Sequence, residues 1–290
     1  MKRRKNRTRR LAVLISAATV LLLLGVAAGL LTARGDWRYH VLYALTRAKK
    51  PNLRAVTLQG ETLTPSDAEL RADERVTFAD TLMLVNRNHP IDASFSPDVT
   101  EADGWSMTAD TRAAFEALRG RVEAKTGERL LILSAYRDDA EQRAELEASG
   151  EAIAARPGES EHEIGLALDV CIRGCGGKSF LKSRAGRLVN RTCAEEGFVI
   201  RYPIGKAEVT GFDYEPWHLR YVGAPHAQVM ERSRLTLEEY LDLLRLGQWY
   251  ETDGYLILRT AEETVTLPAT FTSCVVSQDG MGYRIFTIKR

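Results

Sequence analysis

Residues 11–33, LAVLISAATVLLLLGVAAGLLTA, form an uncharged apolar run of 23 residues. A helix needs about 20 predominantly apolar residues to cross the hydrocarbon core of a bilayer, so the run predicts one transmembrane helix. A cleaved secretory signal peptide is the alternative, and Ala33 with the alanines before it leaves room for cleavage. The apolar part of such a peptide usually spans about 7–15 residues. The length of the run therefore favours an uncleaved signal anchor.

Basic residues on the N-terminal side of this run set its expected orientation. Seven lysines and arginines crowd into residues 1–10, whereas Arg34, Asp36 and Arg38 follow the run. Because positive charge stays on the cytoplasmic side, residues 1–10 are expected in the cytoplasm and the remainder outside the cell membrane. The alternative of a nucleic-acid-binding arm is disfavoured by the apolar run, and a formal net charge of +1 gives no support for a nucleic-acid partner.

The four cysteines fit an extracytoplasmic location, where disulfides persist. They are Cys171, Cys175, Cys193 and Cys274, which allow three full pairings that the sequence does not decide. No C-x-x-C spacing supports a metal site. Disulfides or buried thiols are the expected state.

The remainder of the chain divides by composition into three expected segments. Residues 34–75 are mixed and polar and predict a stem, residues 76–246 a catalytic domain, and residues 247–290 a small β-rich extension with a turn at Asp279-Gly280. Helix and strand signals alternate within the middle segment. Helices are expected at 36–50, 108–127, 138–149, 185–196 and 237–246, and strands at the start of 82–91 and at 130–133, 166–172, 198–202, 209–212 and 218–222, the last two paired with each other.

The stretch SEHEIGLALD, residues 160–169, contains a histidine and an aspartate that are candidate metal ligands. It fails as the zinc motif HExxH because Leu166 stands in the place of the second histidine. On a straight strand, seven residues of separation would send His162 and Asp169 to opposite faces, so they converge only if the chain bends, as Gly165 permits. A surface histidine and an ordinary strand-end charge are the alternative. However, Asp169 lies in the apolar run LALDVC, where an unpaired carboxylate is costly.

A second cluster, Y-E-P-W-H-L-R-Y, places Glu215 and His218 three residues apart around Pro216. Two histidine nitrogens, one carboxylate and a water molecule match a catalytic zinc site. Glu215 would then act as general base. A structural pair of Glu215 with Arg220 is the alternative.

These segments together resemble the VanY-type D-alanyl-D-alanine carboxypeptidases, zinc peptidases of bacterial peptidoglycan. The resemblance covers roughly residues 80–245. Its most specific parts are S-x-H-x-x-G-x-A-x-D and, about 45 residues later, E-P-W-H. The matching segments, in chain order, are LVNRNHP (84–90), SAYR with Gln142 (134–142), SEHEIGLALD (160–169), GFVIRYP with Gly205-Lys206 and Thr210-Gly211 (197–211), EPWH (215–218) and EEYL (238–241).

The resemblance implies an α+β fold, in which a small antiparallel sheet with packed helices carries a single zinc site. It implies His162, Asp169 and His218 as zinc ligands and Glu215 as the base that takes a proton from a zinc-activated water. Glu163, the tempting partner of His162, would be a bystander.

The substrate implied by the resemblance is a peptidoglycan stem peptide ending in D-Ala-D-Ala. Arg137 would stabilise the carbonyl oxygen as it becomes negative, or grip a carboxylate, and Ser160 and Gln142 would help to bind the terminal carboxylate. The sequence departs from the family pattern at Ala135, where glycine is usual, and in the insert 171–177, where a Cys171–Cys175 bridge would shape the pocket rim.

The expected protein is therefore a membrane-anchored zinc D,D-carboxypeptidase, a hydrolase of the metalloprotease class. L,D-carboxypeptidase or endopeptidase action on stem peptides uses the same chemistry and stays open. A non-catalytic wall-binding module is the alternative from another class, but such a module has no need of Glu215.

Overall fold

A computed structural model describes Gly25 and residues 48–92, 94–151 and 153–290. The expected transmembrane run and the expected helix at 36–50 lie almost entirely outside these described residues. Within them, no helix combines the length and the apolar character that crossing a bilayer requires.

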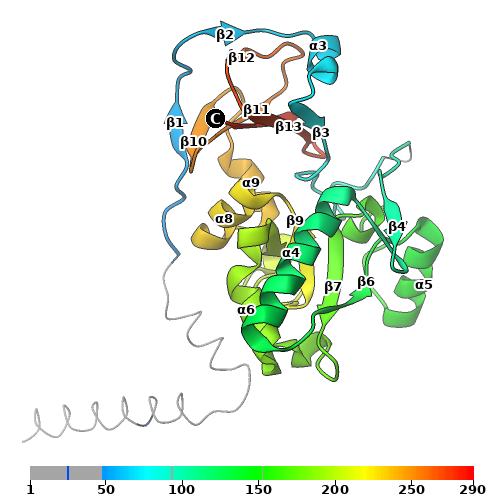
Figure 1. Ribbon diagram of the computed structural model, residues 1–290. Helices are drawn as coiled ribbons and strands as arrows, with labels where there is room; N and C mark the ends of the chain where they lie inside the picture. The colour runs from blue at the N-terminus through cyan, green and yellow to red at the C-terminus, as the bar shows by residue number, and fades with distance from the viewer. Residues whose placement is uncertain (1–24, 26–47, 93, 152) are drawn as a thin grey trace, which may run out of the picture. The chain divides into compact units, whose positions relative to one another are not determined.

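The segment with the candidate site is built on a four-stranded antiparallel sheet (Figure 1). Its strands, in spatial order, are β6 (Leu131–Ser134), β7 (Ala167–Cys171), β9 (His218–Tyr221) and β8 (Phe198–Ile200). All three pairings are antiparallel, so the expected small antiparallel sheet is confirmed.

Helices α4 (Ala109–Thr126) and α6 (Arg184–Thr192) form one apolar core with this sheet. The Thr108 side chain caps α4, and Gly127 ends it in the left-handed region at φ 71°, as the sequence predicts. The core unites residues from both layers: Phe115, Leu118, Val122, Ala185 and Val189 from the helices and Leu168, Val170, Phe198 and Leu219 from the strands. Because side chains alternate along a strand, Asp169 points away from this core.

The described chain contains further helical elements. The expected helix at 138–149 is confirmed as α5 (Asp139–Ser149), which begins with a reciprocal capping box between Asp138 and Glu141. The expected helix at 185–196 is α6 continued by a 3-10 turn. The other elements are the 3-10 helices η1 (Glu161–Ile164), η2 (Gly177–Lys182) and η3 (Cys193–Glu196) and the helices α3 (Asp67–Ala72), α7 (Ala207–Thr210), α8 (Ala224–Ser233) and α9 (Leu237–Leu243).

A second sheet joins residues expected as a stem to the C-terminal extension. Its six strands, in order, are β1 (Arg54–Val56), β10 (Trp249–Thr252), β11 (Tyr255–Thr260), β14 (Arg284–Lys289), β13 (Ser273–Gln278) and β3 (Val76–Phe78). The two short pairs are β2 (Thr62–Leu63) with β12 (Leu267–Pro268) and β4 (Thr100–Ala102) with β5 (Trp105–Met107). Part of the expected stem is thus built into one sheet with the extension.

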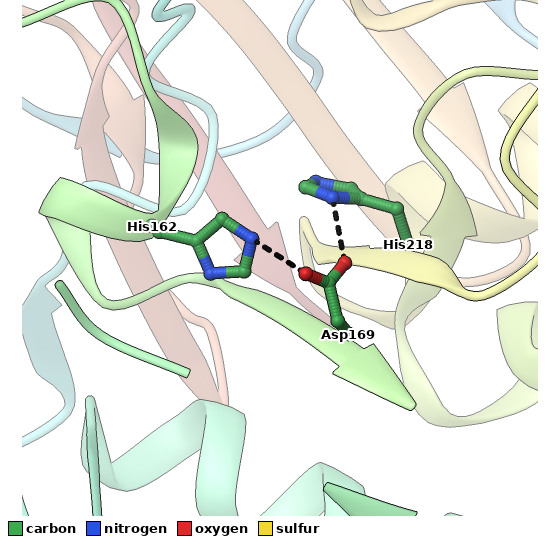
Figure 2. Close-up of side chains that lie close together, drawn as sticks. All are labelled: His162, Asp169 and His218. Carbon is green, nitrogen blue, oxygen red and sulfur yellow. Dashed lines mark ion pairs between the residues drawn. The ribbon is translucent and has the colours of Figure 1, made fainter. Parts of the chain in front are cut away.

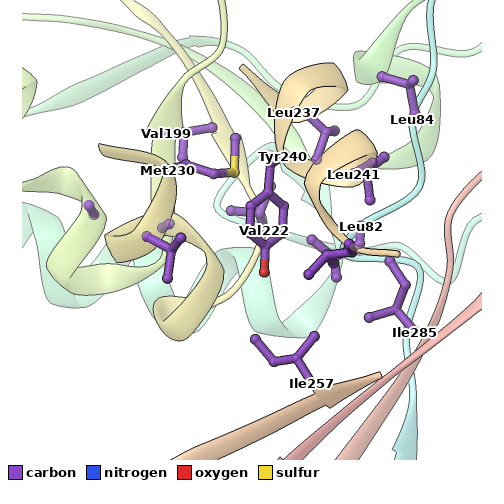
Figure 3. Packing of buried hydrophobic residues seen from close by; sticks show 14 of the residues in the cluster. Leu82, Leu84, Val199, Val222, Met230, Leu237, Tyr240, Leu241, Ile257 and Ile285 are labelled. Carbon is purple, nitrogen blue, oxygen red and sulfur yellow. The ribbon is translucent and has the colours of Figure 1, made fainter. Parts of the chain in front are cut away.

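Helices α8 and α9 pack in a core that also includes side chains of the six-stranded sheet (Figure 3). Leu237, Tyr240 and Leu241 of α9 are fully buried and pack with Ile257 of β11 and Ile285 of β14. The C-terminal strands therefore share a core with helices of the expected catalytic segment.

Two expected strands are wrong. Residues 82–85 are buried, but they lie outside any strand of the described chain. The Leu82 N–H donates to Ser277 Oγ and the Leu84 N–H to the Asp279 carbonyl, so their donors are satisfied without a paired strand. Residues 209–212 belong to α7 and the turn at Gly211 (φ 81°). Strand β9 pairs instead with β7 and β8.

All four cysteines are described, and each is a free thiol. The expected alternative of buried thiols holds for Cys171, Cys193 and Cys274, whereas Cys175 is half-buried. Burial raises the pKa of both Cys193 and Cys274 to about 12, which keeps these two thiols protonated and unreactive. The expected Cys171–Cys175 bridge is wrong, because both residues are free thiols, and the segment is closed instead by backbone hydrogen bonds between Ile172 and Cys175.

Stability is expected to fall in acid because of His226. Its ring is buried between Tyr240 Oη (2.7 Å) and Thr287 Oγ1 (2.9 Å), and burial lowers its pKa to about 3. Below pH ~6.5 the His226 ring is protonated in the unfolded chain but stays neutral in the folded chain. The stability that neutral His226 contributes is therefore lost as the pH falls from ~6.5 toward ~3. At ~1.4 kcal/mol per pH unit, the loss from pH 6.5 to pH 5 is roughly 2 kcal/mol. Denaturant unfolding at these two pH values should show that loss in the wild type and a smaller one in His226→Gln, with His89→Gln as control; equal losses in all three would contradict it.

Candidate metal centre

Three sequence-predicted ligands converge on the face of the four-stranded sheet opposite its helical core (Figure 2). Asp169 of β7 lies directly opposite His218 of β9 in the antiparallel register, and His162 lies on the adjoining helix η1. Asp169 Oδ2 lies 3.4 Å from His162 Nε2, and Asp169 Oδ1 lies 3.1 Å from His218 Nδ1. One ligand atom from each residue fits within a group no wider than 4.8 Å.

The bend that brings His162 to Asp169 occurs at Gly165. Its φ of 70° is left-handed, and a Cβ there would meet Val99 Cγ1 at 2.4 Å. Both the backbone conformation and the available space therefore require glycine. The expectation that the chain bends at Gly165 is confirmed.

The orientation of the side chains suits a metal ion. His162 Nδ1 lies 2.6 Å from the Ala135 carbonyl and donates to it, so His162 Nε2 carries the lone pair that faces Asp169. His162 Nε2 and Asp169 Oδ1 are buried, yet neither makes a hydrogen bond within the described part of the chain. Buried polar atoms without partners call for an explanation, and two imidazole nitrogens with one carboxylate are a donor set typical of catalytic zinc.

Electrostatics keep His162 and Asp169 in the protonation states that a metal needs. Burial lowers the pKa of His162, which favours the neutral ring. Burial alone would raise the pKa of Asp169, but the nearby His162 and His218 hold it well below its usual range. A neutral imidazole and an ionised carboxylate are the forms that coordinate a cation. At His218, burial alone would lower the pKa, but the nearby carboxylates of Asp169 and Glu215 outweigh it and raise the pKa.

Glu215 stands beside this group as the sequence predicts. Its backbone N–H donates to the Tyr202 carbonyl (3.0 Å), and its Oε2 lies 3.9 Å from His218 Nδ1. Burial raises the pKa of Glu215 to about 7, an effect that His218 opposes and the charge of Asp169 reinforces. A carboxyl group with a pKa near neutrality suits a general base.

Arg137 lies on the other side of the ligands. Its Nε donates to Ser134 Oγ (3.1 Å) and its Nη1 to Gln142 Oε1 (2.9 Å), and its Nη2 lies 3.7 Å from Asp169 Oδ2. The Gln142 amide donates in turn to the Ala155 carbonyl (2.7 Å). Gln142 is fully buried, so in this structure it holds Arg137 in place.

Glu163 has a structural role, as expected of a bystander. Its carboxylate accepts hydrogen bonds from the backbone N–H groups of Gly158 and Ser160. The Ser160 hydroxyl accepts from the His162 N–H (3.3 Å) and caps η1. These bonds fix the short helix that carries His162.

One cavity of about 170 Å³ contains all seven residues predicted from the sequence. Sequence reasoning missed half of its lining, because most of those residues are apolar or aromatic and carry no chemical signal. The residues missed are Glu145, Ile153, Ala154, Ala155, Tyr202, Phe212 and Trp217. Tyr202 and Trp217 lie within segments that the family resemblance already includes.

Comparison with known proteins agrees with this geometry. A family model described as VanY, D-alanyl-D-alanine carboxypeptidase, matches residues 105–224. The bifunctional D-Ala-D-Ala dipeptidase and D-Ala-D-Ala carboxypeptidase VanXYC of Enterococcus gallinarum is 37% identical over 183 residues, which are 57% of this chain and 95% of the relative. The chain belongs to the VanY family. A second relative is the putative carboxypeptidase YodJ of Bacillus subtilis. It is 34% identical to this chain over 57% of this chain and 68% of YodJ.

Comparison with solved structures also shows that this chain has the VanY fold. A variant of the vancomycin resistance D,D-pentapeptidase VanY, in complex with Zn(II), is 32% identical with a TM-score of 0.50, covering 56% of this chain and 98% of that chain. The vancomycin resistance D,D-dipeptidase VanXYg, in complex with a D-Ala-D-Ala phosphinate analogue, is 26% identical with a TM-score of 0.65, covering 79% and 99%. The expected family and α+β fold are confirmed.

Proposed function

We propose that this VanY-family chain is a zinc-dependent D,D-carboxypeptidase that hydrolyses the terminal D-Ala-D-Ala bond of peptidoglycan stem peptides. The observation that carries the proposal is the grouping of His162, Asp169 and His218 with a carboxyl group, Glu215, whose pKa is near neutral. A wall-binding module would need neither a metal-binding group nor a base. The D-Ala-D-Ala dipeptidase and carboxypeptidase activities named for VanXYC, and a solved complex of VanYB with D-alanine-D-alanine, support the choice of substrate.

The three ligands would hold the zinc, which when bound supplies Lewis-acid activation of a water molecule and of the scissile carbonyl. The Glu215 carboxylate takes a proton from the attacking water and passes it to the nitrogen of the departing D-alanine. The buried position of Glu215 keeps its pKa high enough to accept that proton at neutral pH. Arg137 supplies a fixed positive charge to the substrate oxygen that becomes negative.

Replacement of Arg137 by lysine is expected to lower kcat/KM about 10²–10³-fold, the usual cost of removing one oxyanion donor. The guanidinium is held by Ser134 and Gln142, and an ammonium group cannot reproduce this two-sided arrangement. The control is Arg143→Lys, whose side chain is exposed on α5 and pairs with Asp139. Steady-state kinetics should separate the two variants, and equal activities would contradict a role for Arg137 at the substrate.

The proposed substrate is tested with synthetic stem peptides. The full chain, purified in mild detergent and loaded with zinc, is offered a pentapeptide ending in D-Ala-D-Ala and a tetrapeptide ending in a single D-alanine. Release of D-alanine from the pentapeptide supports the proposal, and release from the tetrapeptide alone would assign L,D-carboxypeptidase action instead. Release from neither peptide would overturn both.

We also propose that residues 11–33 anchor the chain in the cell membrane, with residues 1–10 in the cytoplasm and the catalytic segment outside. The support is the length of the apolar run and the basic residues that precede it. External protease on intact spheroplasts should degrade residues 48–290 and spare an epitope placed before residue 11. Protection of the catalytic segment would contradict the proposed orientation.

A further inference from the structure

A buried group of four charged side chains lies behind the candidate metal centre. Glu161 and Arg220 are fully buried and Arg201 is 1% exposed, whereas Glu238 at the edge is 14% exposed. Glu161 Oε1 accepts a hydrogen bond from Arg201 Nε (2.7 Å) and lies 2.8 Å from Arg220 Nη1. Two carboxylates and two guanidinium groups balance, so the group can be buried without a net charge.

Other contacts fix both arginines, and therefore fix Glu161. Arg201 donates to both oxygens of Glu238, at 3.0 and 2.6 Å. Arg220 Nη2 donates to the carbonyls of Thr81 (3.1 Å) and Met83 (2.8 Å). The carboxylate of Glu161 is thus held in a single orientation.

The second oxygen of this carboxylate faces a metal ligand. Glu161 Oε2 lies 4.0 Å from His218 Nε2, and both atoms are buried without a hydrogen bond to any residue that the structure describes. The other nitrogen of the same ring, Nδ1, faces Asp169 and Glu215. The imidazole of His218 therefore lies between a carboxylate behind it and the candidate metal centre in front of it.

We propose that Glu161 is a positioning residue that accepts the Nε2–H of His218, so that Nδ1 presents its lone pair to the metal. The proposal rests on the zinc centre of the proposed function. A movement of the His218 ring by about 0.8 Å reduces the 4.0 Å separation to about 3.2 Å, within hydrogen-bond distance. A carboxylate partner also makes an imidazole a more basic ligand.

This assignment gives the two histidine ligands different supports. His162 is held by a backbone carbonyl, that of Ala135, whereas the side chain of Glu161 lies behind His218. Consecutive residues then act together at η1: Ser160 caps it, Glu161 orients His218, and His162 binds the metal directly. A purely structural ion group would account for Arg201 and Arg220, but not for the free oxygen aimed at His218.

The test compares zinc affinity in two variants of the full chain, measured by competition with a chromophoric chelator. Glu161→Gln removes the charge that faces His218. Glu238→Gln removes one charge from the same buried group, through Arg201, at a residue that the structure does not place against His218. We expect Glu161→Gln to weaken zinc binding about 10–100-fold, the usual effect of losing such a partner, and Glu238→Gln to weaken it less than about threefold. Equal effects, or no effect of Glu161→Gln, would overturn the proposal.

A second measurement needs no variant and so does not depend on whether Glu161→Gln folds. In the zinc-loaded wild type labelled with ¹⁵N-histidine, we expect His218 to show a metal-bound Nδ1 and an Nε2–H protected from solvent exchange. A metal-bound Nε2, or a rapidly exchanging Nε2–H, would overturn the proposal. Neither measurement uses a peptide substrate: loss of zinc affinity in Glu161→Gln without D-alanine release by the wild type would leave this inference standing and reject the proposed function.

Discussion

Replacement of Glu215 by glutamine is expected to lower kcat about 10²–10⁴-fold while zinc stays bound. Glutamine has nearly the same shape but no basic carboxylate, so it cannot take the proton of the attacking water. Glu215 is not one of the three grouped ligand residues, and its carboxylate lies 3.9 Å from His218 Nδ1. The metal-binding group should therefore persist.

The measurements are turnover of the D-Ala-D-Ala pentapeptide and zinc content of the same preparation. The control is Glu208→Gln, which changes an exposed carboxylate on α7 and should leave turnover unchanged. Undiminished turnover in Glu215→Gln would remove Glu215 from the mechanism. A parallel loss of zinc would make it a ligand instead of a base.

Replacement of Asp169 by asparagine is expected to reduce zinc affinity by more than ~100-fold, beyond the usual effect of losing a residue that only supports a ligand. Asp169 contributes the single carboxylate of the donor set, and it lies between the two histidine rings. An amide oxygen carries no charge to neutralise the cation. The turnover that depends on zinc should be lost with it.

The matched control is Asp213→Asn, a change of the same kind two residues before Glu215, at a carboxylate outside the metal-binding group. Chelator competition gives the affinities, and far-UV circular dichroism verifies that both variants fold. Equal zinc affinities of the two variants would show that Asp169 does not coordinate the metal.

Local signals in the sequence were sufficient to predict the helices and strands that carry the site. Thr108 caps the start of α4 and Gly127 ends it, as the capping preferences of threonine and glycine indicate. The costly carboxylate in LALDVC, the bend at Gly165 and the rigid E-P-W-H turn indicated the candidate ligands, and the family resemblance joined them into one site. Each of these signals acts within about ten residues, and the structure joins them through the pairing of β7 with β9.

The pairing of strands that are far apart in the chain could not be predicted from the sequence. Strand β1 of the expected stem pairs with β10 across almost two hundred residues, and β3, at the start of the expected catalytic segment, runs parallel to β13. Neither segment carries a local signal for its partner. The buried position of residues 82–85 depends on Ser277 and Asp279 in the same way. The role of Glu161 depends on Arg201 and Arg220, which are 40 or more residues away in the chain.

The claim that supports the rest is that His162, Asp169 and His218 hold one zinc ion. Anomalous diffraction at the zinc absorption edge, from crystals of the zinc-loaded full chain, tests it directly. The expected result is a single strong peak in contact with His162 Nε2, an Asp169 carboxylate oxygen and His218 Nδ1. A fully loaded protein with no peak at this position, or with its peak elsewhere, would contradict the account.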